Sequence, residues 1–177
     1  MKLTAHFCTY LLITGIGMAQ DKAPKAAGQE TVITIKDATG ATVGKGVLSE
    51  AKPRGVKLDL DMKNFPPGNH LFHIHQKPVC EAAEEFTTAG LQYDPTGEMY
   101  GNEHHHAHSG PSAGDPRMSV NIDEKGSGHA TVTFPALTLG DDDHSVFRNG
   151  GTAIIFHSAA GATGPTRIAC GVIFKQN

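Results

Sequence analysis

The chain has 177 residues, a length typical of one domain that can bury a hydrophobic core. Its formal net charge is −3 with neutral histidines, which argues against the basic surface that nucleic acids or anionic membranes would require. We therefore expect no nucleic-acid partner.

Residues 1–19 have the pattern of a secretory signal peptide. Lys2 supplies the positive start, and residues 7–18 are mostly apolar but short for a membrane span. An N-terminal anchor or a first helix is the alternative interpretation. The pattern predicts an exported protein, periplasmic or extracellular, with no membrane span after removal of the signal. A flexible leader at 20–30 and one domain at 31–177 would follow.

Alternating apolar and β-branched residues indicate about eight short strands separated by glycine- and proline-containing turns. The predicted strands are 31–36, 41–48, 54–62, 68–76, 118–122, 130–134, 151–157 and 167–174. No segment has a convincing amphipathic helical pattern. Short strands at this spacing predict an all-β fold, a sandwich or a barrel.

Residues 77–116 show no strand or helix pattern, and a loop of about forty residues is far longer than most connections. Such loops are usually functional or held by a cross-link. After removal of the signal, Cys80 in this loop and Cys170 in the last strand are the two remaining cysteines. An even pair in an exported domain predicts one disulfide, with two unrelated buried thiols as the alternative.

His73 and His75 are two residues apart in the predicted strand 68–76. Their side chains should therefore leave the same face of the strand, roughly 6 to 7 Å apart along it. Two imidazoles at that spacing can share a metal ion. In a chain with 11 histidines, however, such a pair is as readily a chance occurrence as a metal-binding motif.

Taken together, these features resemble the copper/zinc superoxide dismutase family over residues 30–177. The motifs that carry the resemblance are 68–75, 110–115, 140–145, 154–157 and 167–173. The resemblance implies an eight-stranded Greek-key β-barrel with a long disulfide-tied loop and copper on its outer wall. It also implies an enzyme that dismutates superoxide to oxygen and hydrogen peroxide.

Carried over position by position, the resemblance assigns three copper ligands, His73, His75 and His157. Arg167 matches the arginine that guides superoxide to copper. His70 matches a buried structural histidine and is not counted as a ligand. The two cysteines match the family's disulfide pair. One copper ion per chain is the cofactor that the resemblance implies.

The zinc side departs from the family pattern. The histidine that bridges copper and zinc falls on Gln92, the next zinc histidine falls near Tyr100, and the third falls on Ser112. Only the zinc aspartate is retained, as Asp115. Zinc needs about four ligands in a closed site, so we expect a copper-only or degenerate exported bacterial member. An amide cannot titrate like an imidazole, so weakened dismutation is expected.

A secondary metal site is the remaining expectation. His104, His106 and His108 alternate in the loop that also holds Asp115, and several of these groups can converge in a loop. The alternative is a solvated histidine tract that binds metals weakly. Two functions compete: a dismutase, favoured by the retained Arg167, and a copper carrier or buffer that exchanges copper with a donor or acceptor protein. The missing bridge and the histidine run favour the carrier.

Overall fold

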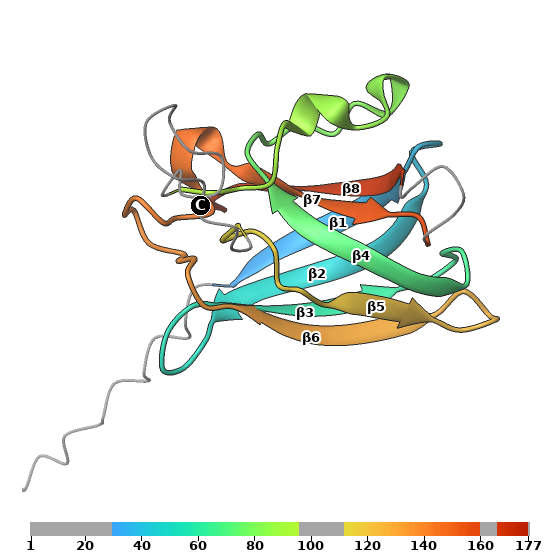
Figure 1. Cartoon of the computed structure of the whole chain (residues 1–177), viewed down its shortest axis with the longest axis horizontal. Coiled ribbons are helices and arrows are strands. Elements are labelled where there is room, and N and C mark those ends of the chain that lie inside the picture. The colour runs from blue at the N-terminus through green and yellow to red at the C-terminus, as the bar shows by residue number, and fades with distance from the viewer. Residues whose placement is uncertain (1–29, 96–111, 160–165, 177) are drawn as a thin grey trace, which may run out of the picture.

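The protein is described here by a computed structural model that covers residues 30–95, 112–159 and 166–176. In these ranges, eight antiparallel strands curl into a nearly closed barrel (Figure 1). The strands are β1 Thr31–Asp37, β2 Thr42–Glu50, β3 Val56–Met62, β4 Gly68–His75, β5 Ser119–Ile122, β6 Gly128–Phe134, β7 Thr152–His157 and β8 Arg167–Ile173. All eight predicted strands are present, and no end differs from the prediction by more than two residues. The predicted signal peptide 1–19 and all but the last residue of the leader 20–30 lie outside the described residues.

The strand order is β5-β4-β7-β8-β1-β2-β3-β6. β3 pairs with β6 and β4 pairs with β7, so the chain crosses between non-consecutive neighbours as in a Greek key. β5 and β6 end the order and are joined by a tight turn, in which the Asp123 N–H donates to the Ser127 carbonyl. The predicted all-β barrel is therefore confirmed.

Period two in β4 decides which side chains face the core. Phe72 and Ile74 are fully buried and belong to the central hydrophobic cluster. Successive strand residues point to opposite faces, so His73 and His75 lie on the outer face of the barrel wall. In β7, Ile154 likewise belongs to the central cluster, and His157 has the opposite parity. The sequence pattern thus brings the three histidines to one face.

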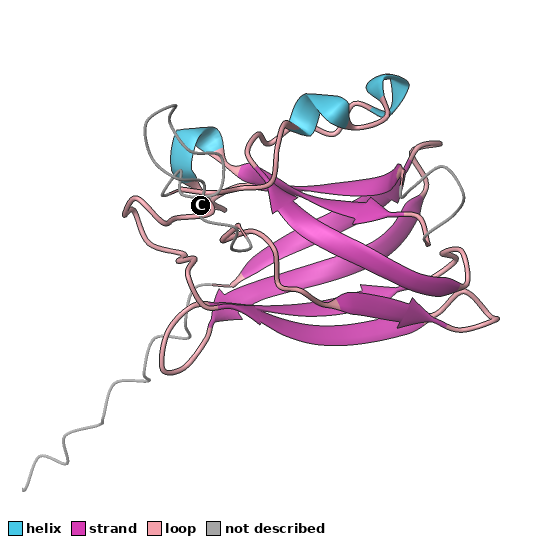
Figure 2. Ribbon diagram, in the orientation of Figure 1, coloured by secondary structure: helices cyan, strands magenta, loops and turns pink. Residues whose placement is uncertain are grey.

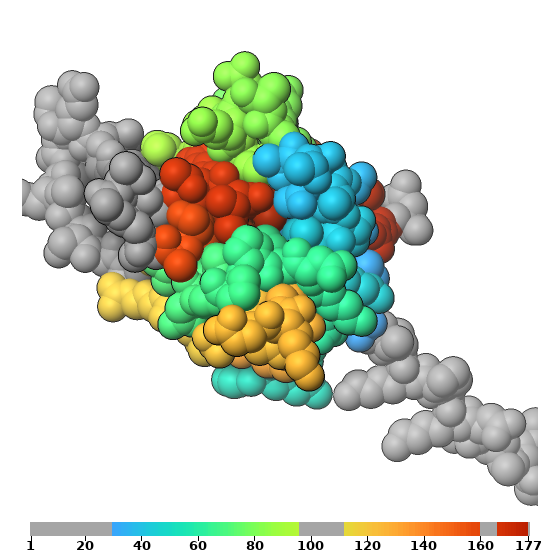
Figure 3. All heavy atoms as spheres, turned by 90° about the vertical axis from the view of Figure 1, so that its right-hand side faces the viewer, coloured from blue at the N-terminus to red at the C-terminus, as the bar shows by residue number. Residues whose placement is uncertain are grey.

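The segment after β4 is fixed to the barrel by the predicted disulfide. Cys80 and Cys170 are bonded, with their Cα atoms 5.6 Å apart and 90 positions apart in sequence. Phe86 and Ala89 add apolar contacts in a second buried cluster that includes Cys170. Figure 3 shows this segment, light green at the top, standing over β8 in red and β1 in blue. The interpretation of two unrelated thiols is excluded.

Within that segment the chain forms short helical turns that its sequence pattern did not predict. They are 3-10 turns at Ala82–Glu84 and Thr87–Ala89. A third 3-10 turn, at Arg148–Gly150, lies in another loop, between β6 and β7 (Figure 2). Turns of this length are too short to show helical periodicity in sequence. Among the described residues, no helix is long and apolar enough to span a membrane.

Candidate metal centre

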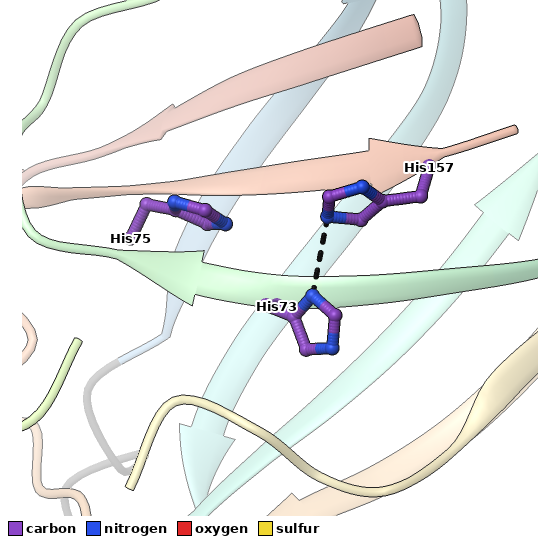
Figure 4. A group of neighbouring side chains, drawn as sticks. All are labelled: His73, His75 and His157. Atoms are coloured by element: carbon purple, nitrogen blue, oxygen red, sulfur yellow. Dashed lines mark hydrogen bonds between the residues drawn. The ribbon is translucent and has the colours of Figure 1, made fainter. Parts of the chain in front are cut away.

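Three imidazoles converge on the outer wall of the barrel. His73 and His75 come from β4 and His157 comes from the end of β7 (Figure 4). One ligand nitrogen from each ring lies within 4.8 Å of the others, and Nδ1 of His73 is 3.2 Å from Nε2 of His157. In the ranges that the structure covers, these residues form the only group of three or more histidines, cysteines or acids that could hold a metal ion.

The hydrogen bonding of His75 fixes which of its nitrogens is free. Nδ1 lies 2.9 Å from the Gly90 carbonyl oxygen, which can only accept a hydrogen bond, so Nδ1 carries the proton. Nε2 then presents a lone pair, and it is buried without a hydrogen-bond partner among the residues that the structure describes. A buried unpartnered nitrogen calls for an explanation. A copper ion fits here, because imidazole nitrogens are ligands that copper favours.

Arg167 holds the loop that carries Gly90. Its guanidinium donates one hydrogen bond to the Phe86 carbonyl at 2.7 Å and another to the Gly90 carbonyl at 2.9 Å. The Gly90 oxygen therefore accepts from both Arg167 and His75. Gly90 has φ +82, a conformation that glycine adopts without strain. Sequence reasoning missed this shared acceptor, since a backbone carbonyl leaves no signal in the residue pattern.

His70 supports the centre from the inside of the wall and is not one of its ligands. The ring is buried, with Nδ1 2.8 Å from the His157 carbonyl and Nε2 2.8 Å from the Pro66 carbonyl. A neutral ring donates to only one of these two oxygens. Phe65 packs edge-on against it with ring centroids 4.9 Å apart. These contacts hold the backbone of His157 against the turn that precedes β4.

Burial keeps the three imidazoles neutral. Desolvation lowers the pKa of His75 and of His157 from 6.5 to about 4. Burial also lowers the pKa of His73, although the negative charge of Asp115 opposes this effect. Metal binding requires neutral imidazole, so the ligands are ready at neutral pH without releasing protons.

These lowered pKa values predict how the stability of the metal-free protein depends on pH. Below pH 6.5 the unfolded chain binds protons at His75 and His157 that the native state does not bind, so the free energy of unfolding should fall as the pH decreases to about 4. Urea denaturation at pH 7, 5.5 and 4.5 measures this.

The histidine effect can be separated from that of the carboxylates. Hydrogen bonds lower the pKa values of Asp37, Asp59 and Asp142 from 3.8. Stability that depends on these carboxylates is therefore lost mainly below the pH range in which the histidines act. A His75→Gln/His157→Gln variant should lose most of the dependence between pH 4.5 and 6.5. Equal stability of the native sequence at pH 7 and 4.5 would contradict the prediction.

Two of the positions that the resemblance aligns with the family's bridging and zinc histidines, Gln92 and Ser112, lie beside this centre. Gln92 forms an isolated antiparallel bridge with His75, and its side-chain oxygen accepts a 2.8 Å hydrogen bond from the buried Ser112 hydroxyl. Oδ1 of Asp115 is 3.7 Å from Nε2 of His73. The structure therefore brings Gln92, Ser112 and Asp115 against the histidine cluster. Tyr100, His104, His106 and His108 lie outside the described residues.

The sequence of this chain is similar to those of known proteins. The family model described as copper/zinc superoxide dismutase (SODC) matches residues 42–173. A Cu-Zn superoxide dismutase of Brucella abortus is 40% identical over 109 residues, which are 55% of this chain and 57% of that protein. The match thus spans little more than half the length of that relative. The Cu-Zn superoxide dismutase of Pasteurella multocida is 33% identical over 141 residues, 74% of this chain and 73% of that protein.

A solved structure supports the same fold. The crystal structure of a superoxide dismutase-like protein from Bacillus subtilis has a TM-score of 0.69 at 22% identity, covering 81% of this chain and 98% of that one. At this identity the likeness concerns the fold alone. The family model matches well over half of the chain, and the Pasteurella relative matches across more than two thirds of both proteins. The chain belongs to the copper/zinc superoxide dismutase family.

Proposed function

We propose that this protein is an exported, copper-dependent superoxide dismutase that converts superoxide to oxygen and hydrogen peroxide. The observation that carries the proposal is the convergence of three neutral imidazoles around the buried Nε2 of His75, which has no hydrogen-bond partner in the described part of the chain. Family membership and relatives named Cu-Zn superoxide dismutase support it. Bound copper would supply the one-electron chemistry by alternating between its cupric and cuprous states.

The ligands would be Nδ1 of His73, Nε2 of His75 and a ring nitrogen of His157. Nε2 is the nitrogen of His157 that faces His73. Two strands of one antiparallel ladder carry them, because β4 pairs with β7 from Phe72 to His75. The Gly90 carbonyl fixes the orientation of the His75 ring. A rigid ligand set of this kind should hold copper without large movements between its two oxidation states.

Arg167 would attract the superoxide anion, and its removal tests the enzymatic proposal. We expect Arg167→Ala to lower the rate constant for superoxide decay by about tenfold and to weaken its decrease with rising salt, because a fixed cation raises the encounter rate of an anion. Stopped-flow measurement at several ionic strengths gives both quantities. Copper content is measured in parallel, since Arg167 also holds Gly90.

Arg54→Ala is the matched control, because Arg54 is exposed in the turn between β2 and β3, two strands that carry none of the three histidines. Arg167→Lys separates charge from loop support, since lysine retains the charge but not the two-pronged hydrogen bonding. A rate that is the same in the native protein and Arg167→Ala, at equal copper content, would exclude a role for this cation in dismutation.

We propose further that activity is reduced and that the family's zinc site is lost. Gln92 stands where the family has its bridging histidine, and its amide oxygen is occupied by Ser112. An amide cannot take up and deliver a proton in this pH range, so water has to do so. Asp115, the one zinc ligand retained, lies against His73.

Restoring the imidazole tests this proposal. Gln92→His should raise the dismutation rate by roughly tenfold or more, since a positioned proton donor contributes about 10²–10⁴-fold in enzymes. Superoxide decay after copper loading is the measurement, and Gln92→Asn is the control that changes the side chain without adding a titratable group. An unchanged rate with histidine would show that proton delivery does not limit this protein. Elemental analysis after mixed copper and zinc loading should find copper without stoichiometric zinc.

A copper carrier or buffer is the second candidate function. Among the described residues the site has three imidazoles and no fourth histidine, a ligand set that favours the cuprous state, and the Gln92 amide oxygen, which accepts the Ser112 hydroxyl, is a weak copper ligand. Such a protein would exchange copper with a donor or acceptor protein. Superoxide decay no faster than in buffer, together with rapid transfer of copper to a cuprous chelator, would favour this function over the enzyme.

Two parts of the proposal concern residues outside the described ranges. We propose that residues 1–19 direct export and that His104, His106 and His108 form a second, weaker copper-loading site. Cell fractionation with N-terminal sequencing tests export, with the periplasm or medium as the expected location. Alanine at all three histidines should lower total copper at saturation without changing the high-affinity stoichiometry. Unchanged total copper would show that the run is solvated surface.

A further inference from the structure

We propose that Asp115 is a positioning residue of the copper centre, whose carboxylate holds His73 in the tautomer that presents Nδ1 to the metal. The resemblance to the family implies that this aspartate is a zinc ligand. The contacts of Asp115 in this chain give it a different role. The inference rests on the proposed function, because it concerns the same three-histidine site.

The two nitrogens of His73 face different partners. Nδ1 lies 3.2 Å from Nε2 of His157, on the side where the three rings converge. Nε2 lies 3.7 Å from Oδ1 of Asp115. A neutral imidazole that binds a metal through Nδ1 must carry its proton on Nε2. The carboxylate therefore lies on the side where the proton has to be, and at 3.7 Å it acts through electrostatic attraction rather than a full hydrogen bond.

Backbone hydrogen bonds set the position of this carboxylate. Oδ1 of Asp115 accepts the Arg117 N–H at 2.7 Å, and the Asp115 N–H donates to the Ser112 carbonyl at 3.0 Å. One residue earlier, the Gly114 carbonyl accepts the N–H of Ile74 at 2.9 Å. Ile74 lies between His73 and His75 in β4, so the segment is bonded to the backbone between the two histidines.

Gly114 shows how closely this segment approaches the strand. A side chain there would collide with the Ile74 carbonyl oxygen, so the close contact requires glycine. The Gly114 N–H also donates to the Tyr93 carbonyl at 2.8 Å, which links the segment to the loop that carries Gln92. The side chains of His73 and Asp115 retain only 12% and 22% of their exposure. The pair is therefore held at the edge of the site, largely shielded from water.

Asp115 does not form a cluster of three or more ligands with any other described residues. The hydroxyl of Ser112, which the resemblance aligns with the family's third zinc histidine, donates a hydrogen bond to Gln92. Both residues therefore support groups on the copper side. A carboxylate beside the outer nitrogen of a histidine makes that histidine a stronger donor. Loss of a hydrogen-bonded partner of this kind typically lowers metal affinity about 10–100-fold, so the longer contact at 3.7 Å should lie at the low end of that range. The stronger donor favours the cupric state.

Replacement of the carboxylate by an amide tests the role. In the full chain, Asp115→Asn should lower cupric affinity about tenfold in chelator competition and alter the cupric electron paramagnetic resonance spectrum. It should also raise the midpoint potential. A tenfold loss of cupric affinity with unchanged cuprous affinity corresponds to a rise of about 59 mV for this one-electron couple. Asp115→Glu should recover part of each change.

Asp123→Asn is the matched control. Oδ1 of Asp123 also accepts the N–H of the residue two positions later, Lys125, at 2.9 Å, and it lies in the β5–β6 turn. Asp115→Ser is a second variant, because a serine oxygen still accepts the Arg117 N–H without supplying a carboxylate. The control should match the native protein, and the serine variant should behave like Asp115→Asn.

The outcomes separate this inference from the proposed function. If the native protein binds copper but Asp115→Asn and Asp115→Ser match it in cupric affinity, spectrum and potential, the positioning role is wrong. Loss of a bound zinc ion with no change at copper would also overturn it and would make Asp115 a zinc ligand. If the native protein does not bind copper, the proposed function itself fails.

Discussion

Alanine at His75 is expected to remove high-affinity copper binding. The change deletes the ligand whose Nε2 is buried and leaves two imidazoles of the described cluster, His73 and His157. The loss of affinity should exceed the roughly 10–100-fold that loss of an outer-shell partner costs. Competition with a chromophoric cuprous chelator, and with a cupric chelator in a second series, measures affinity in both oxidation states. His157→Ala should have an effect of the same order.

His129→Ala is the control for this prediction. His129 lies on β6, is largely exposed, and bonds Asp61 through Nδ1 at 2.9 Å, so it has the same chemistry without access to the cluster. Its removal should leave the high-affinity site unchanged. If His75→Ala retained the native affinity while His129→Ala did not, the metal centre would have to be placed elsewhere.

Loss of the disulfide is expected to be the largest single change in stability. The bond between Cys80 and Cys170 closes a loop across 90 positions. A loop of that length contributes about 4–5 kcal/mol through the entropy of the unfolded chain. Cys80→Ser/Cys170→Ser should therefore lower Tm by roughly 10–20 °C for a domain of this size. Calorimetry of the oxidised native protein and of the variant gives the difference.

Reduction of the native protein with dithiothreitol is the matched comparison and should lower Tm to the value of the variant. A decrease of only one or two degrees would mean that the packing of Phe86 and Ala89 already holds the loop. The disulfide also affects the metal centre, because the loop it anchors carries the Gly90 carbonyl that orients His75. We expect faster copper loss from the variant even below its Tm.

The fold was largely predictable because its strands obey period two. The alternation of Val56, Leu58, Leu60 and Met62 in β3 is visible in the sequence, and all four side chains are buried. The same rule placed His73 and His75 on one face, although it could not say whether that face was open or covered. The loop that covers this face has no periodic pattern of apolar residues, so its 3-10 turns were not predicted.

The candidate site was predictable in its side chains and not in its backbone contacts. The three histidines follow from spacing and family resemblance, and the structure brings them together. The Gly90 carbonyl, which accepts from both His75 and Arg167, has no counterpart in a residue pattern. The proximity of Asp115 to His73 depends on the backbone hydrogen bond from the Ile74 N–H to the Gly114 carbonyl, which joins residues far apart in sequence. Such contacts require the folded chain.

The decisive measurement is the decay of superoxide in the presence of the copper-loaded protein, with dissociated copper removed by a chelator. We predict catalytic decay, faster than in buffer and proportional to the concentration of protein. We also predict that His157→Ala abolishes it and that Gln92→His increases it. Decay at the rate of buffer alone, in a native protein that carries one copper ion per chain, would contradict the proposed dismutase and leave a copper-binding protein.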